Sequence, residues 1–198
     1  TALSRIMLRT RGASENKRRL LAAVATSIAL YAAPVWAHAL KKKRNVKRMA
    51  TVQRAMAIRV SRAYRTVDTR GVLVIARQIP WHILAEERRL RHEDRREPDP
   101  QKRKTKRQRR EDTIERWQAE WSEEASGGQW TRRLIPSLRP WITRPHEQLH
   151  QALSGHGCYQ QYLHRVKKVP NPECALCMTG EPDTAEHTLA ECDFFGYE

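Results

Sequence analysis

The sequence predicts a mainly α-helical protein. In three segments, residues 20–40, 46–65 and 112–126, apolar residues recur every three or four positions, which is the spacing of one helix face. Charged residues make up 30% of the 198 residues and the mean hydropathy is -0.78, so a dense, core-rich globule is not expected. We divide the chain into a helical region (residues 1–78), a charged connector with short helices (79–170) and a small C-terminal unit (171–198).

The positive charge is concentrated in the first third of the chain. The formal net charge is +16, and residues 1–65 hold sixteen Lys and Arg residues against one acid, Glu15. A polyanion is the natural partner of such a surface, and nucleic acid is the commonest polyanion.

Residues 20–40 form the first apolar segment and carry no charged side chain. Their large apolar residues step by three or four, so we expect a helix with one face against a core, ended or kinked at Pro34. The length also suits a membrane span, but eight of the twenty-one residues are alanine and the stripe is one-sided. A membrane-anchored basic protein therefore stays only as an alternative. The expected buried stripe is Leu20 or Leu21, Val24, Ile28, Tyr31 and Val35.

Residues 46–65 predict an amphipathic helix with Met49, Val52, Met56, Val60 and Ala63 on its apolar face. Few acids lie nearby to pair with the opposite, basic face, so we favour contact with a phosphate backbone over a merely solvated face. A basic amphipathic helix can also lie on an anionic membrane. The candidate nucleic-acid-binding residues are Lys41, Lys42, Lys43, Arg44, Lys47, Arg48, Arg54, Arg59, Arg62 and Arg65.

The connector begins with mixed signals. Residues 69–78 are a short apolar helix or strand, and Pro80 suits the first turn of a helix that carries Ile83, Leu84, Glu87 and Leu90. Residues 86–112 are almost all polar, and residues 101–110 hold seven basic residues in ten. Such a run indicates a solvated linker, a nuclear-localisation signal or a non-specific nucleic-acid contact, and these roles can coexist.

The second half of the connector is richer in tryptophan. Ile114, Trp117, Trp121 and Ala125 form a helical stripe, which we expect Gly127-Gly128 to end. Residues 130–146 are rich in Pro and Trp, so we expect an extended or turned segment whose tryptophans anchor a sparse core rather than stack on bases. Residues 146–167 predict two short helices around the Gly-His-Gly sequence at 155–157.

Four residues near the C-terminus carry the clearest chemical signal. They follow the pattern C-x2-C-x9-H-x4-C, and three thiolates with one imidazole within nineteen residues fit a tetrahedral zinc site. The alternative is a set of reduced thiols with a surface histidine, and a disulfide framework is weaker still, because such frameworks are usually smaller and denser in cysteine. The predicted ligands are Cys174, Cys177, His187 and Cys192.

The segment around these ligands predicts their local structure. Asn171-Pro172 is a turn signal, and Asp183 with Glu186 resembles a capping box at the start of a short helix. His187 and Cys192 are five residues apart, so Cys192 must lie at or past the helix end to reach the same metal. The other cysteine, Cys158, is expected to be a small buried side chain, although His156 and His164 beside it leave a second metal site open.

The order of motifs resembles the C-terminal part of the reverse-transcriptase polyprotein of non-LTR (LINE-type) retrotransposons. The segment LSRIMLRTRGASENKRRLLAAVATSIALYAAPVW is similar to the end of their reverse-transcriptase domain as it enters the thumb, with Ala32 where glycine is usual. The segments RVSRAYRTVDTRGVLVIARQIPWHILAEER, RWQAEW, WTRRLIPSLRPWI and LSGHGCYQQYLHR follow in the family's order, and the Cys/His array matches its C-terminal zinc knuckle. The closest likeness is to the type-one elements inserted in arthropod ribosomal RNA genes. Two departures are a slightly longer loop between Cys177 and His187 and an unusually basic QKRKTKRQRR segment.

The resemblance implies a thumb-like helical region, a connector and a zinc knuckle from a parent polyprotein with RNA-directed DNA polymerase and endonuclease activities. The chain has no Asp-Asp pair, so the family's catalytic motif is absent and we expect a fragment that is inactive alone. Magnesium would serve only the missing polymerase and endonuclease sites. The implied partners are template RNA, target DNA and the upstream polyprotein, with no membrane, and the implied location is the nucleus at integration. A free-standing zinc-dependent nucleic-acid-binding module is the main alternative.

Overall fold

The computed structural model describes residues 14–123, 127–143 and 150–195, and within them the chain is mostly helical, with one isolated antiparallel bridge between Glu173 and Pro182. The mainly α prediction is confirmed. The first thirteen residues of the predicted region 1–78, and the start of the thumb-like motif within them, lie outside the described residues. The α-helices are α2 (Glu15–Ala29), α3 (Ala33–Trp36), α4 (Lys43–Ser61), α5 (Thr69–Ile75), α6 (Trp81–Asp94), α7 (Lys106–Ser122), α8 (Gln129–Leu134), α9 (Leu138–Thr143), α10 (His150–Ser154) and α11 (Gln160–Arg165). The segments η1 (Ala37–Lys41), η2 (Pro100–Lys102) and η4 (Asp193–Phe195) are 3-10 helices, and η3 (His187–Glu191) is a π-helix.

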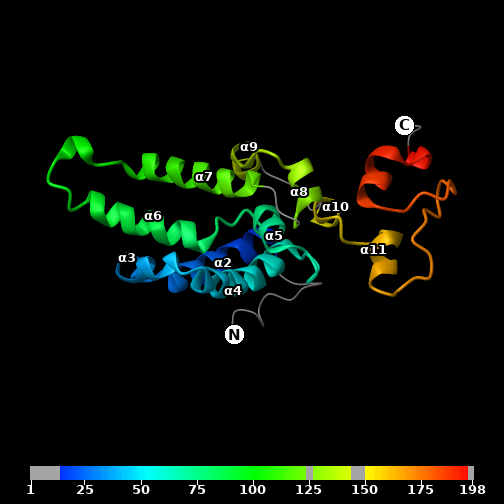
Figure 1. Ribbon diagram of the computed structural model, residues 1–198, viewed down its shortest axis with the longest axis horizontal. Helices are drawn as coiled ribbons and strands as arrows, with labels where there is room; N and C mark the ends of the chain where they lie inside the picture. The colour runs from blue at the N-terminus through cyan, green and yellow to red at the C-terminus, as the bar shows by residue number, and fades with distance from the viewer. Residues whose placement is uncertain (1–13, 124–126, 144–149, 196–198) are drawn as a thin grey trace.

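The helices form an elongated molecule with three parts (Figure 1). Helices α6 and α7 make a long hairpin, and α2, α3 and α4 pack below α6. Helices α5, α8, α9 and α10 gather at the open end of the hairpin, and α11 leads into the C-terminal unit at the far end. The two short helices predicted within residues 146–167 are α10 and α11.

Helix α5 is the centre of the first core. Asp68 caps it by accepting hydrogen bonds from the N–H groups of Arg70 and Gly71, at 2.8 and 3.3 Å, which explains why this apolar segment is a helix rather than a strand. All side chains from Val72 to Ala76 are buried. Helix α4 packs against it with the predicted residues Met56 and Val60, and the predicted Ala63, just after the helix, is buried in the same core. Val52 is 58% exposed and does not belong to the buried face.

The stripe predicted to be buried in residues 20–40 is wrong except at its alternative first position, Leu21, which is half-buried against the core. The other large residues of the stripe are exposed: Leu20 is 68% exposed, Ile28 68% and Tyr31 79%, and Val24 and Val35 are also exposed. The buried face instead consists of Arg18, Ala22, Leu30, Ala33 and Ala37. Alanine has little side-chain volume, so this face lets α2 and α3 approach α4 and α6 closely, which large residues would prevent.

The helix break near Pro34 is confirmed. Helix α2 ends at Ala29, Ala32 takes a left-handed conformation with φ of 49°, and Pro34 lies in the first turn of α3. No single helix in the described part of the chain is long and apolar enough to cross a membrane. The bent pair Glu15–Ala29 and Ala33–Lys41, which meet at 53°, satisfies length and composition only when both helices are counted together.

Only the first half of the basic run at residues 101–110 lies outside an α-helix. Residues Lys106–Arg110 are the first turns of α7, because Thr105 and Gln108 form a reciprocal capping box at its start. Ion pairs then join α7 to α6: Arg109 to Asp94 at 2.6 Å and Arg110 to Glu87 at 3.2 Å. The hydrogen bond from Arg109 holds the pKa of the buried Asp94 carboxyl below its usual range, so the pair stays charged.

The Pro/Trp segment is also helical where an extended connector was expected. Within residues 129–143 the chain forms α8 and α9, and α7 ends at Ser122, before the predicted glycines; Ala125 lies outside the described residues. The role of the tryptophans as core anchors is confirmed. Trp121 is 1% exposed and donates its ring N–H to the Ile135 carbonyl at 2.8 Å, and Trp141 donates to the Val74 carbonyl at 2.7 Å.

The C-terminal unit is held to the helical body through α11. Tyr159, Tyr162 and Ala185 form a small apolar cluster, and the Tyr162 hydroxyl lies 3.0 Å from the Thr66 hydroxyl in the loop after α4. Asp183 joins the unit to α11, since its Oδ2 accepts the N–H of Gln160 at 2.8 Å. These contacts give the metal-ligand segment a fixed position on the body.

Candidate metal centre

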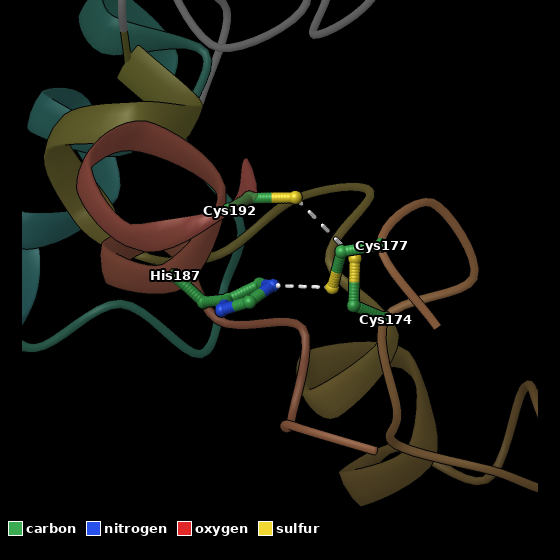
Figure 2. Close-up of side chains that lie close together, drawn as sticks. All are labelled: Cys174, Cys177, His187 and Cys192. Carbon is green, nitrogen blue, oxygen red and sulfur yellow. Dashed lines mark hydrogen bonds between the residues drawn. The ribbon is translucent and has the colours of Figure 1, made fainter. Parts of the chain in front are cut away.

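The structure brings the four predicted ligands together. One atom from each of Cys174, Cys177, His187 and Cys192 lies within 4.8 Å of all the others (Figure 2). The Cys177 sulfur is 3.3 Å from His187 Nε2, and the Cys174 and Cys192 sulfurs are 3.9 Å apart. A tetrahedral ion with metal–sulfur bonds of about 2.3 Å needs sulfur–sulfur separations of about 3.8 Å. The four side chains can therefore hold a metal ion with little rearrangement.

The first two ligands come from a loop that closes on itself. Cys174 donates its N–H to the Glu181 carbonyl at 2.8 Å, and Asp183 donates to the Pro172 carbonyl at 2.9 Å. Asn171 accepts the N–H of Glu173 at 2.9 Å, which is the turn predicted before the first cysteine. The two backbone hydrogen bonds hold the ends of this loop together and so fix the segment that carries Cys174 and Cys177.

The second two ligands come from the π-helical turn η3. Cys192 donates its N–H to the His187 carbonyl at 2.7 Å, a bond that spans five residues. The wider turn brings both side chains to one side, and Cys192 is the C-terminal cap, as the five-residue spacing predicted.

The predicted capping box at this turn is wrong. Thr184 accepts the N–H of His187 at 2.9 Å and so does the work expected of Asp183. The Asp183 carboxylate instead accepts the N–H of Gln160 in α11 with one oxygen and the Thr188 hydroxyl, at 2.6 Å, with the other. Glu186 forms an ion pair with Arg133 of α8, with an N–O distance of 2.7 Å. Threonine is itself a good capping residue, so the sequence offered a signal for Thr184, but the acidic pair competed with it.

The surroundings shift the pKa values of three ligands in different directions. The Thr179 hydroxyl, 3.1 Å from the Cys177 sulfur, together with the Thr179 N–H and His187, lowers the pKa of Cys177 to about 6. Burial raises the pKa of Cys192, and the pKa of His187 is raised by its hydrogen bonds to Cys177 and Cys174, which outweigh the opposing effect of burial. Cys177 is thus the most easily deprotonated of these three ligands, and a metal ion would have to displace the protons that Cys192 and His187 retain more strongly. Sequence reasoning did not single out Thr179.

The other cysteine does not behave as predicted. Cys158 is exposed rather than buried. His156 turns toward the backbone, with Nδ1 2.8 Å from the Ser154 carbonyl, and His164 is exposed. Among the described residues, the group of four at the C-terminus is the one cluster of His, Cys, Asp and Glu side chains that can hold a metal ion.

The ten candidate nucleic-acid-binding residues divide into two sets. Six of them, all exposed and without an ion pair in the described part of the chain, precede or begin α4. Arg54 and Arg59 are half-buried and donate to backbone carbonyls, Arg54 to Val67 and Arg65 and Arg59 to Ala55, while Arg62 forms the left-handed C-terminal cap of α4. Arg65 is exposed. We refer to the six exposed residues as the basic row: Lys41, Lys42, Lys43, Arg44, Lys47 and Arg48.

The fold and the site define a helical protein with a C-terminal Cys3His cluster that can hold a metal ion. The sequence is 30% identical over 162 residues to the retrovirus-related Pol polyprotein from type-1 retrotransposable element R1 4 of Nasonia vitripennis. The match covers 73% of this chain and 40% of the relative, so the chain spans about two fifths of the relative's length. The chain is related to a retrotransposon Pol polyprotein, and the resemblance predicted from its sequence is confirmed. No family model matches the chain, and no solved structure matches it.

Proposed function

We propose that this chain is the C-terminal part of a retrotransposon Pol polyprotein with RNA-directed DNA polymerase and endonuclease activities, and that it binds template RNA and target DNA during target-primed reverse transcription. The observation that carries the proposal is that this chain, which is related to a Pol polyprotein, has the basic row on its surface. In this proposal the upstream polyprotein supplies the magnesium-dependent active sites, and the fragment alone is inactive. The work takes place in the nucleus, where integration occurs.

The basic row suits a phosphate backbone. Its six cations fall within eight residues, and no side chain caps the start of α4 and no acid lies in its first turn. The positive end of a 19-residue helix therefore adds to the field of the side chains. Such a surface attracts nucleic acid without regard to sequence and with strong salt dependence.

Zinc is the ion we assign to the metal centre. Three soft thiolates and one imidazole at tetrahedral spacing are the donor set that zinc prefers in structural sites. Phe194 and Phe195 lie two and three residues after the ligand Cys192, and their rings are 60% and 53% exposed. The two rings form an edge-to-face pair with centroids 5.2 Å apart. Exposed aromatic rings beside a rigid metal core can stack on the bases of a single strand.

The basic row is tested by measuring how binding of a 20-nucleotide RNA depends on salt. Lys43→Gln with Lys47→Gln should lower the slope of log affinity against log salt by about 1.4, because each lost contact with a single strand contributes about 0.7. Arg95→Gln with Lys168→Gln removes the same charge from exposed positions elsewhere and should leave the slope nearly unchanged. A salt-independent affinity of the unaltered chain, or equal effects of the two double variants, would count against the proposal.

A further inference from the structure

A second concentration of positive charge lines an open pocket of about 500 Å³ away from the basic row. The pocket lies between α2, the loop that joins α5 to α6, the middle of α6 and the first turns of α7. It contains one acidic side chain, Glu87, among its lining residues. Six basic side chains line it: Arg19, Arg77, Arg88, Arg91, Lys106 and Arg110.

The protein neutralises only part of this charge. Glu87 is 4% exposed, and one of its carboxylate oxygens lies 3.2 Å from Arg110 and 3.9 Å from Arg91. Within the described residues, Arg19 and Lys106 have no ion pair and no side-chain hydrogen bond. Cations held together with one shared acid repel one another unless an anion joins them.

The floor of the pocket offers hydrogen-bond donors without partners. The buried Nε of Arg77 and Nε2 of Gln78 have no acceptor in the described part of the chain. Buried polar groups are almost always satisfied. Oε2 of Glu87, an acceptor in the same pocket, is also unpaired, so the lining holds polar atoms of both kinds that a bound ligand would pair after a small movement of these side chains.

Hydrogen bonds of the backbone fix the positions of Arg77 and Gln78. Arg77 and Gln78 close α5 with a two-bond motif: Gln78 donates to the Leu73 carbonyl and Arg77 to the Val74 carbonyl, both at 2.9 Å. The left-handed position of this motif usually holds glycine, yet here it holds Arg77, with φ of 53°. The Arg77 guanidinium lies 5.1 Å from the centre of the Trp141 ring, a cation–π contact that restricts its side chain.

We propose that this pocket binds the phosphodiester backbone of a nucleic-acid strand. The inference rests on the proposed function, and it adds a second contact site to the basic row. The cations without an acidic partner come from three elements: α2, the loop between α5 and α6, and α7. Because they are spread over these elements, they suit an anion that carries several charges in succession. Arg19, Arg77 and Lys106 contact the phosphates, Gln78 donates to a phosphate or sugar oxygen, and Glu87 holds Arg91 and Arg110 toward the strand.

The test uses the full chain, with fluorescence anisotropy of a 20-nucleotide RNA and of a DNA of the same sequence. Arg19→Gln with Lys106→Gln removes two cations that have no acidic partner, so folding should be retained, as circular dichroism can check. At 0.1 M salt we expect affinity to fall about 25-fold and the salt slope to fall by about 1.4. The matched control, Arg95→Gln with Lys168→Gln, changes two exposed residues outside the pocket and should have little effect.

A second pair of variants covers the case in which the double variant does not fold. Ala23→Glu places a carboxylate at an exposed helical position that lines the pocket, and Ala119→Glu makes the same change at an exposed position of α7 outside it. Ala23→Glu should weaken binding about 5-fold or more, and Ala119→Glu should not. If the pocket variants and their controls bind alike while the basic-row variants still weaken binding, the pocket proposal is overturned and the proposed function stands. If the unaltered chain binds neither probe, both are overturned.

Discussion

Replacing Cys174 by serine tests the C-terminal unit most directly. The Cys174 side chain is 4% exposed, and its sulfur lies 3.9 Å from that of Cys192. Serine has nearly the same size, but its hydroxyl is a poor zinc ligand at neutral pH. The substitution therefore removes one metal ligand and changes little else.

The expected magnitude follows from the ligand set. Small zinc units bind their ion with about 10–16 kcal/mol, so the loss of one ligand in four should cost about 3 kcal/mol or more, which weakens binding ~100-fold or more. Within residues 171–195, the buried side chains are Cys174, Ala185, His187 and Cys192. Three of these four are ligands, so a unit without its ion has almost no core, and we expect it to unfold locally while α2–α7 stay folded.

Two assays measure the outcome. Elemental analysis should find one zinc ion per unaltered chain and almost none in the Cys174→Ser variant. Hydrogen exchange should show lost protection at the N–H of Cys192, which is bonded to the His187 carbonyl at 2.7 Å, and unchanged protection in α5.

Cys158→Ser is the matched control, because Cys158 is exposed and lies outside the cluster. It should keep the full zinc content. Retention of zinc by Cys174→Ser, or its loss from Cys158→Ser, would refute the assignment of the ligands.

Stability measurements test the α6–α7 hairpin and the alanine-rich face of the body. Asp94→Asn removes the nearer of the two carboxylates that pair with Arg109, the other being Asp112 at 3.6 Å, so the free energy of unfolding in urea should fall by about 1.5–3 kcal/mol. Arg107→Gln breaks an exposed pair and should cost less than about 1 kcal/mol. Because the Asp94 pKa is lowered in the folded state, this stabilisation is complete above about pH 4 and is lost as the pH falls through the lowered pKa. Melting curves from pH 7 downward should show that loss in the unaltered chain and not in Asp94→Asn. Ala57→Leu overfills a position that is 0% exposed and should cost about 1–3 kcal/mol, while Ile28→Ser, at 68% exposure, should change stability by about 0.5 kcal/mol or less. The reverse order of these two effects would show that the buried face is wrongly assigned.

The metal cluster could be predicted from sequence because its determinants are local. Ligand type and spacing are written in nineteen residues, and the five-residue interval alone placed Cys192 at a helix end. The capping residue was harder, since Thr184, Asp183 and Glu186 all suit a helix start. Only the contacts of Asp183 with α11 and of Glu186 with α8 decide between them.

The buried face of α2 could not be predicted from hydropathy. Periodicity identifies the most apolar face, which here contains Leu20 and Ile28, but the face that packs is the one that lets helices approach closely. That choice depends on partners such as Ala57, more than thirty residues away in the chain.

Long-range contacts also decide the connector. Lys106–Arg110 continue as a helix because Asp94 and Glu87, on α6, neutralise Arg109 and Arg110. A composition-based analysis finds seven cations in ten residues and has no means to see carboxylates that arrive from another helix.

The π-helical turn η3 links metal binding to the way in which residues His187–Glu191 wind. In an ordinary α-helix, residues five apart lie about 140° around the axis from each other, so an α-helical turn over these residues would direct Cys192 away from His187. The wider turn absorbs the extra residue and keeps both ligands on one side. An ion held by both ligands would stabilise this winding of residues His187–Glu191, and with it the direction in which Phe194 and Phe195 leave the unit.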